Sequence, residues 1–509
     1  MAPVNRDDPE RRRLLGLLRR HGWNATSFQA IEPEFCYWFD PEGACCARAA
    51  PDALYTRFHS RGHARSFRAR TGVWKIATAR SVDVRWLAVL LGVALTAFAV
   101  RLTYITAQVS QEGPDSVQYR ALAQNLRAHH AFSLDLGPPF GPTIRRAPLY
   151  PLFLALVAGS GDGISGERAR VWQAVLDSLV AAMICLILYG LVRMRWAVAA
   201  GMVYALHPAA MLYASSILSE SLFTFLATLA VTVLLFGIRR DGLAWIFAAG
   251  LLMGLAALAR PVAAPFFLIV AAAIWWSRMS IRRPVAMAVV FSAATLAVLT
   301  PWIVRSSAAA GRFVLVSATG PVNFALATAP APWNLNDQSS IWQTEHYWRE
   351  NPCGRALRDA RTPPESARAD QTCLQVALQD LRKNPRYYIR NRISQLVHLP
   401  LTSFDVATGN SSSFHTALQQ RAWAVLGMKL GLFTVFSLVP LLAGMVGLFV
   451  GKRSMEKTLC GALWVFTILI HLPGYVEYRY FFPAVPMLLI TGAFAFDWLE
   501  RTFTPEPNP

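Results

Sequence analysis

The sequence predicts an all-α protein that crosses a membrane many times. Of its 509 residues, 54% are hydrophobic and only 16% are charged, whereas a soluble domain carries about 25% charged residues. The apolar residues form continuous blocks of about twenty, the length that a helix needs to cross a hydrocarbon core. Because the blocks do not alternate between apolar and polar residues, a membrane β-barrel does not fit.

The blocks predict a bundle of about ten to twelve transmembrane helices. Two shorter apolar stretches, 149–158 and 393–404, are expected to be interfacial or re-entrant. The expected spans are 86–107, 171–191, 196–214, 217–236, 243–259, 262–276, 284–304, 428–450, 458–474 and 480–498.

Arginines and lysines between the blocks orient the chain, because short cytoplasmic loops carry an excess of them. With the N-terminus inside, the basic turns that fall in the cytoplasm contain Arg193, Arg195, Arg239, Arg240, Arg278, Arg282, Arg283, Lys452, Arg453 and Lys457. The net charge of +19 then belongs to turns that face anionic lipid, and no nucleic-acid-binding motif accompanies it.

This orientation divides the chain into parts with different expected surroundings. They are a basic cytoplasmic extension (1–85), an N-terminal transmembrane module (86–304) with its first outer loop (108–170), an extracytoplasmic cap (305–427), C-terminal transmembrane helices (428–498) and a tail (499–509). Cys353 and Cys373 share the cap. They would form a disulfide in an oxidising compartment and stay reduced otherwise, and the sequence leaves both states open.

An acidic residue, Asp115, follows the first span of a chain that otherwise keeps charge out of its apolar stretches. A carboxylate at the membrane surface can act as a general base, taking the proton from a hydroxyl that attacks a sugar at its anomeric carbon. The alternative is a structural role, because a short amphipathic helix is expected from Ser116 to Leu126 and Asp115 could cap it.

Two arginines, Arg145 and Arg146, come next along the chain. Guanidinium groups bind phosphate through paired, charge-assisted hydrogen bonds, and positive charge there would stabilise a phosphate as it leaves. The alternative is a pair of side chains that snorkel to the interface.

Further charged residues stand at the ends of apolar blocks on the same expected face. Glu220 would orient substrate hydroxyls or share a divalent cation with Asp115, with a first-turn role at a helix N-terminus as the alternative. Arginines at a membrane boundary are candidates for function. The other candidates are Arg260, Arg305, Glu477 and Arg479.

In their order along the chain, these pieces resemble membrane glycosyltransferases of the GT-C superfamily, and within it the protein mannosyltransferase and lipid A aminoarabinose transferase group. The matching motifs are Asp115-x-x-x-Tyr119 with Leu122–Leu126, Arg146–Pro151, Ser219–Phe223, Ala259–Pro261, Pro301–Arg305, Gly311–Ser317 and Glu477–Pro483. The asparagine usual after the arginine at position 305 is replaced by Ser306.

The resemblance implies a GT-C-like helical bundle, a sugar donor linked to polyprenyl phosphate, and chemistry on the extracytoplasmic side. Asp115 takes the place of the catalytic carboxylate, and the candidates for binding the donor are Arg145, Arg146, Tyr119, Glu220, Arg260, Arg305, Glu477 and Arg479. The metal requirement stays unknown, with Asp115 and Glu220 as the ligands if a divalent cation is used. The composition, rich in arginine and alanine, suggests a bacterial inner membrane.

We therefore expect an inverting glycosyltransferase that moves a hexosyl or pentosyl group to a protein, lipid or cell-wall glycan acceptor. Two alternatives are a transporter or flippase of lipid-linked saccharides, which would need charged or broken helices near the bilayer midplane, and a non-catalytic GT-C-like subunit. Residues 22–40 separately resemble the start of a lysylphosphatidylglycerol synthase-type domain, a match too short to imply aminoacyl transfer.

Overall fold

The computed structural model consists of two compact units, Met1–Val82 and Asp83–Pro509. The described residues are 28–32, 35–39, 45–49, 84–107, 113–160, 163–276, 282–329, 348–398, 418–451, 454–475 and 478–504. In the first unit they form an antiparallel sheet of β1 (Phe28–Glu32), β2 (Phe35–Phe39) and β3 (Cys45–Ala49), paired in that order.

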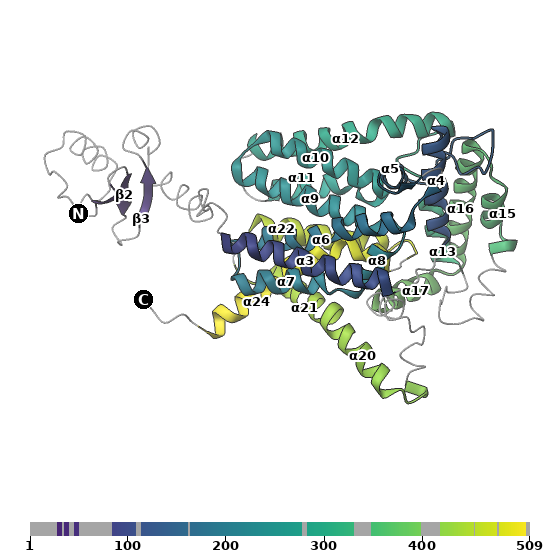
Figure 1. Cartoon of the computed structure of the whole chain (residues 1–509). Coiled ribbons are helices and arrows are strands. Elements are labelled where there is room, and N and C mark those ends of the chain that lie inside the picture. The colour runs from purple at the N-terminus through teal and green to yellow at the C-terminus, as the bar shows by residue number, and fades with distance from the viewer. Residues whose placement is uncertain are drawn as a thin grey trace. The chain divides into compact units, whose positions relative to one another are not determined.

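The second unit is a helical bundle (Figure 1). Its apolar helices are α3 (Val84–Ala107), α6 (Gly166–Leu188), α7 (Met194–Ala205), α8 (Pro208–Ser215), α9 (Glu220–Arg240), α10 (Leu243–Ala259), α11 (Phe266–Trp276), α12 (Arg282–Ala310), α20 (Trp423–Phe433), α21 (Val439–Phe449), α22 (Met455–His471) and α24 (Val485–Phe503). Helix α6 packs between α3 and α9, α10 packs between α9 and α12, and α24 contacts α21, α22 and α7.

The chain is a multi-pass integral membrane protein by the length and composition of its helices. Among the described residues six helices are long and apolar enough to cross a membrane, or seven if the bent pair α7 and α8 counts as one span. This is fewer than the ten to twelve expected, because several predicted spans are short helices. Helix α10 has 17 residues, α11 has 11 and α22 has 17.

Small residues allow neighbouring helices to approach closely. A Cβ atom added at Gly250 of α10 would lie 2.5 Å from the carbonyl oxygen of Phe291 on α12, and one added at Gly254 would lie 2.7 Å from Cβ of Val298. Membrane helices commonly associate through such contacts between small residues, because lipid offers no hydrophobic driving force between them. The spacing of four residues puts both glycines on the face that meets α12.

A charged pair lies buried inside the bundle, contrary to the expectation that the apolar stretches exclude charge. Arg101 of α3 and Asp177 of α6 are both inaccessible to solvent and form an ion pair at 2.5 Å. Arg101 also donates to the carbonyl of Ala205 at 2.8 Å, and the Tyr204 hydroxyl donates to Asp177 at 2.6 Å. Helix α7 ends there and the chain bends by 46° into α8, so Arg101 binds a carbonyl that the break leaves free.

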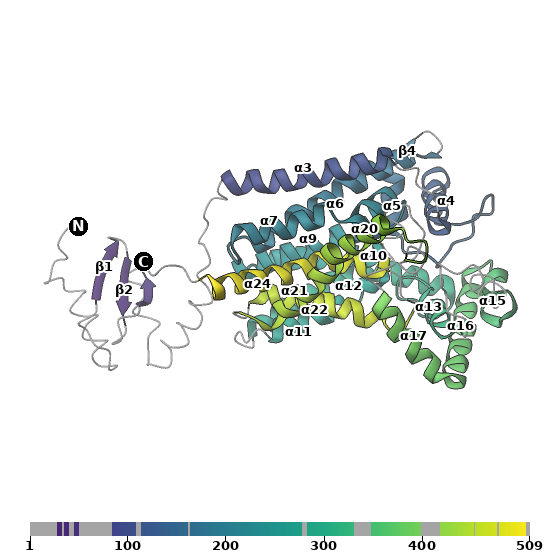
Figure 2. The same cartoon turned by 90° about the horizontal axis from the view of Figure 1, so that it is seen from below.

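Shorter helices gather at one end of the bundle in both views (Figures 1 and 2). They are α4 (Pro114–His129), α5 (Leu149–Val157), α13 (Gly320–Thr328), α15 (Pro352–Asp359), α16 (Pro363–Lys383) and α17 (Pro385–His398). Helix α4 contains the short helix expected at Ser116–Leu126.

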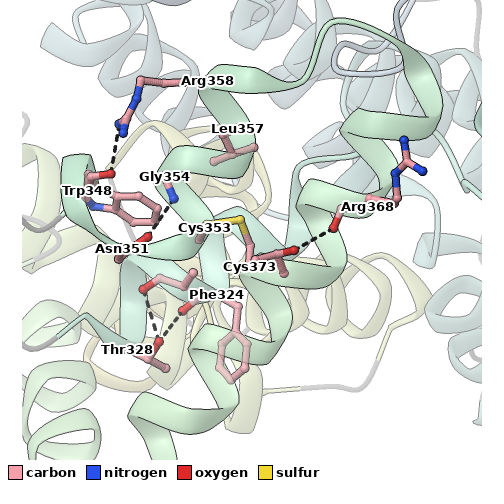
Figure 3. Close-up of a disulfide and its surroundings, with 12 residues drawn as sticks. Phe324, Thr328, Trp348, Asn351, Cys353, Gly354, Leu357, Arg358, Arg368 and Cys373 are labelled. Carbon is pink, nitrogen blue, oxygen red and sulfur yellow. Dashed lines mark hydrogen bonds between the residues drawn. A yellow bond between two sulfur atoms is a disulfide. The ribbon is translucent and has the colours of Figure 1, made fainter.

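A disulfide between Cys353 and Cys373 joins α15 to α16 (Figure 3). Both cysteines are inaccessible to solvent and belong to a small core with Ala325 of α13 and Ala377 of α16. The Asn351 side chain accepts from the backbone N–H of Gly354 at 2.7 Å and so caps α15. The sequence had left this pairing open, and the structure forms it.

Candidate functional site

Asp115 lies in the first turn of α4 between two arginines. Arg146 pairs with one carboxylate oxygen, and Arg479 pairs with the other at 2.7 Å. Arg479 is 364 residues away along the chain, so folding alone creates this triad. The alternative role as a helix cap does not hold, because Gly113 is the N-cap and Asp115 lies inside the helix.

One face of α4 holds the Arg146 guanidinium from two further sides. Its Nε donates to Oε1 of Gln118 at 2.8 Å, and its guanidinium carbon lies 5.2 Å from the centre of the Tyr119 ring. Residues 115, 118 and 119 are three and four positions apart and therefore share a helical face. Sequence reasoning missed Gln118, although it stands inside the motif from Gly113 to Tyr119.

The charge state of Asp115 follows from these neighbours. Burial alone raises the pKa of its carboxyl group, but the charges and hydrogen bonds of Arg146 and Arg479 outweigh burial and hold the pKa below the ordinary value. About a quarter of the side chain is exposed, 27%. The group is an anion at neutral pH, accessible to a ligand from one side.

A second ion pair, between Glu220 and Arg260, lies deeper. Arg260 Nη1 contacts Oε1 of Glu220 at 2.5 Å, and the Glu220 side chain is only 2% exposed. Glu220 is the first residue of α9, where its negative charge also interacts favourably with the helix dipole. This is the alternative role that the sequence suggested for it. Its other oxygen, Oε2, is buried and has no hydrogen-bond partner among the described residues. A buried carboxylate oxygen of this kind calls for a bound water or ligand.

Tyr480 joins the two ion pairs. The guanidinium carbon of Arg260 lies 5.5 Å from the centre of its ring, and that of Arg479 lies 5.1 Å from the same centre. Tyr119 and Arg479 also lie within electrostatic range of Arg260. The structure thus brings Asp115, Tyr119, Arg146, Glu220, Arg260 and Arg479 into one cluster.

A buried hydrogen-bond chain supports the cluster from behind. The Tyr119 ring meets the Tyr150 ring edge to face, with 4.8 Å between centres. The Tyr150 hydroxyl donates to Oε1 of Gln173 at 2.5 Å. Nε2 of Gln173 donates to the carbonyls of Ala214 and Ser216, just before α9. Gln173 was missed, because nothing in an apolar block of α6 distinguishes one glutamine.

Two candidate arginines bind elsewhere. Arg145 donates to the carbonyls of Leu357 and Ala360 at 2.8 Å and 3.3 Å, so its guanidinium turns towards α15. Arg305 of α12 donates to the carbonyl of Thr143 at 2.9 Å. Both therefore hold the loop that carries Arg146, and neither forms an ion pair with Asp115. Glu477 lies outside the described residues.

Few side chains in the cluster could ligate a metal ion. Among the residues that the structure describes, no three histidine, cysteine or acidic side chains lie close enough together to hold an ion. Asp115 and Glu220, the ligands suggested by the sequence, are each occupied by arginine. In this cluster the two carboxylates hold the guanidinium groups of Arg146, Arg260 and Arg479 in place.

No protein-family model matches the sequence, and no curated protein matches it. Solved structures show a distant similarity. The oligosaccharyltransferase AglB from Archaeoglobus fulgidus, in complex with an inhibitory peptide and a dolichol-phosphate, matches with a TM-score of 0.48 and 14% identity. The match covers 83% of this chain and 52% of that one. ArnT from Cupriavidus metallidurans, bound to undecaprenyl phosphate, matches with a TM-score of 0.32 and 15% identity over 82% of this chain and 78% of that one.

The chain spans about half the length of the archaeal oligosaccharyltransferase. At such identities and TM-scores the likeness carries nothing about substrate, and the function has to be inferred from the site itself.

Proposed function

We propose that the chain is a membrane-embedded inverting glycosyltransferase that moves a sugar from a polyprenyl-phosphate donor to a hydroxyl acceptor. The observation that carries this proposal is the Asp115 carboxylate held between Arg146 and Arg479, outside the spanning helices and partly open to solvent. A base beside two phosphate-binding groups is what displacement of a lipid phosphate from a sugar requires.

The reaction balances with these groups. The acceptor oxygen forms a bond to the anomeric carbon while the bond from that carbon to the phosphate oxygen breaks. The acceptor proton goes to Asp115, and the electron pair of the broken bond stays on the polyprenyl phosphate. Arg146 and Arg479 would stabilise the negative charge that develops there. A single displacement inverts the anomeric configuration.

The arginine contacts also suggest how Asp115 becomes basic. Both guanidinium groups hold the pKa of Asp115 below its ordinary value, which makes it a weak base. A donor phosphate that takes over hydrogen bonds from Arg146 and Arg479 would relax this effect and add a negative charge nearby. Donor binding would therefore raise the pKa of Asp115 just when a proton must be taken up.

Glu220 and Arg260 suit recognition of the sugar. Oε2 of Glu220 is buried and unpartnered among the described residues, so a sugar hydroxyl would satisfy it. Arg260 holds the other oxygen and fixes the position of the carboxylate. Tyr119 and Tyr480, on either side, offer ring faces of the sort that pack against sugars and cations.

The extracytoplasmic side fits this site best. The Cys353–Cys373 disulfide belongs to the helices that Arg145 contacts, and disulfides persist in oxidising compartments. The excess of arginine in the short turns supports the same orientation. We assign the protein to a bacterial inner membrane, with the acceptor, a protein, lipid or glycan, outside the cytoplasm.

The decisive experiment incubates the purified protein with a panel of polyprenyl-phosphate sugars and follows donor consumption by mass spectrometry. Asp115→Asn should lower turnover by about 10²–10⁴-fold, the usual contribution of a general base. Donor binding should be kept or strengthened, because both arginines lose their internal partner. Asp380→Asn, a change on the outer helix α16, is the control. Full turnover in Asp115→Asn would remove the mechanism.

The same donors in sealed vesicles test the transport alternative. The bent pair α7 and α8 is a broken helix of the kind that a flippase uses, but Arg101 and Asp177 already occupy that break. We expect glycosidic transfer and no movement of intact donor across the bilayer. Vectorial movement without transfer would replace the glycosyltransferase with a flippase.

A further inference from the structure

Helix α17 carries an apolar stripe that no part of the protein covers among the described residues. Ile389, Ile393 and Leu396 are 58%, 60% and 43% exposed. Spacings of four and three residues place them along one side of the helix. Exposed Arg386 and Arg390, also four residues apart, form a row beside this stripe. Apolar side chains flanked by arginines are typical of helices that lie in a membrane interface.

The flank of α17 next to the stripe, on the side away from Arg386 and Arg390, is fastened to the protein near the candidate site. The Tyr388 hydroxyl donates to the carbonyl of Pro473 at 2.8 Å. Buried Arg392 donates to the carbonyls of Gly474 and, at 3.3 Å, Ala327. Pro473 and Gly474 follow α22 and precede Arg479 by a few residues. The helix is therefore held along one flank of the stripe, and the exposed Arg386 and Arg390 lie along the other flank.

The stripe lies beside the end of the apolar helix α22. Leu396 lines a small recess with Ile468 and Leu472 at the end of α22, and Tyr480 borders the same recess. Leu469, in that last turn of α22, is 57% exposed, as expected for a lipid-facing residue. The stripe thus continues the lipid-facing surface of a membrane helix where that helix ends. In Figure 2, α17 lies between the end of α22 and α16.

We propose that α17 is a membrane-surface helix that inserts Ile389, Ile393 and Leu396 into the outer leaflet and holds anionic lipid headgroups with Arg386 and Arg390. Apolar faces of such helices sit about 5–10 Å into the boundary between headgroups and acyl chains. Arginines beside the stripe reach up to phosphate while their stems stay in contact with the chains. The bilayer is a better occupant than a protein partner, because the stripe is continuous with a lipid-facing helix and bordered by positive charge.

This surface would also steady the candidate site. Tyr388 and Arg392 tie α17 to the turn before Arg479, so lipid contact along the stripe would also restrain that turn. The inference does not depend on the proposed chemistry, because it concerns lipid contact and is tested without measuring sugar transfer.

The test places a fluorescent bimane label at Ile393→Cys in the full chain, with Cys36, Cys45 and Cys46 replaced by serine, in lipid nanodiscs. Ser394→Cys, the next position on the helix and also exposed, is the matched control. We expect brominated lipids to quench the label at 393 more than the label at 394, and aqueous iodide to do the opposite. Bromines near the glycerol end of the chain should quench more than those near the methyl end.

The role of charge is tested with lipid composition. Quenching at 393 by brominated anionic lipid should exceed that by brominated zwitterionic lipid, and Arg386→Gln with Arg390→Gln should abolish the difference. Arg382→Gln with Lys383→Gln, a change of equal charge at the end of α16, should keep it. Equal quenching at 393 and 394 would overturn the proposal. So would protection of 393 from both lipid bromines and iodide, because a second protein surface would then cover the stripe.

Discussion

The Asp115 triad depends on guanidinium geometry and not on positive charge alone. Arg146 uses Nη2 for Asp115 and Nε for Gln118, while its plane lies over the Tyr119 ring. A lysine would keep the charge but has one nitrogen and no planar group. Each of the three contacts is made by a different part of the same side chain.

We therefore predict that Arg146→Lys impairs transfer. Loss of a charge-assisted hydrogen bond costs roughly 1.5–3 kcal/mol, so kcat/KM for the donor should fall about 10- to 100-fold. Steady-state kinetics with the best donor of the panel measures this. Arg382→Lys, at an exposed position at the end of α16, should leave kcat/KM unchanged. Unaltered kinetics in Arg146→Lys would mean that Arg146 acts as a simple positive charge.

The buried hydrogen bond between Tyr150 and Gln173 makes a second prediction at this scale. Tyr150→Phe leaves Oε1 of Gln173 without its donor. Gln173→Leu strands the Tyr150 hydroxyl and removes one hydrogen bond from each of the carbonyls of Ala214 and Ser216. Each single change should destabilise the protein by roughly 1–3 kcal/mol, whereas the double change should cost less than the sum. Unfolding midpoints in detergent measure this double-mutant cycle. Additive losses would show that the two side chains act independently.

At the scale of elements, a buried acidic residue makes the contact between α16 and the loop that contains Arg145 sensitive to pH. Asp370 of α16 is 4% exposed, and burial raises the pKa of its carboxyl group to about 6, although Arg312 and Arg145 oppose the rise. Its Oδ1 has no hydrogen-bond partner among the described residues. A small core contains Ile144, which precedes Arg145, and Val314, which follows Arg312 by two residues. Both pack there with Ala367 of α16.

The sign of the pH effect follows from the raised pKa. The folded state holds the Asp370 proton up to about pH 6, whereas the unfolded chain releases it near the ordinary value of 3.8. Stability is therefore highest below about pH 4 for this group and falls as pH rises to 6. The loss is roughly 2–3 kcal/mol, since one pKa unit corresponds to about 1.4 kcal/mol.

Asp370→Asn should remove this loss. The variant should be more stable than the native protein at pH 7 and should unfold with a weaker dependence on pH between 4 and 6. Thermal unfolding across that range measures both effects, with Asp359→Asn, an exposed change on α15, as the control. If the profiles of the native protein and the Asp370→Asn variant stay parallel, Asp370 does not titrate in this window.

At the scale of the whole molecule, the membrane class was predictable because apolar blocks of helical length are a property of the chain itself. The order of Asp115, Glu220, Arg260 and Arg479 along these blocks also suggested one shared face. What could not be predicted is the course of the loop before α5 and the rotation of each helix about its axis. The loop turns Arg145 towards α15 while Arg146 meets Asp115, and helix rotation brings Gln173 to Tyr150.

The prediction that the apolar stretches exclude charge was wrong at Arg101 and Asp177 for a related reason. Each residue is a single charge in an apolar block, and only their meeting across α3 and α6 makes burial tolerable. The difference in span number comes from length and not from a missed helix end. Helix α10 has the bounds of the expected span 243–259, ending before Arg260 and Pro261, but its 17 residues make it shorter than the six long apolar helices among the described residues.

Orientation in the bilayer provides the last prediction. Helix α9 begins at Glu220 in the candidate site and ends at Arg240. Its 21 residues rise about 1.5 Å each, so Arg240 lies roughly 30 Å from Glu220, across the hydrocarbon core. Val117, 57% exposed on α4, lies beside Asp115. On intact cells, a membrane-impermeant maleimide should label Val117→Cys and not Arg240→Cys, and permeabilised cells should label both. Labelling of only position 240 on intact cells would put Asp115 in the cytoplasm, where no extracytoplasmic acceptor could reach it.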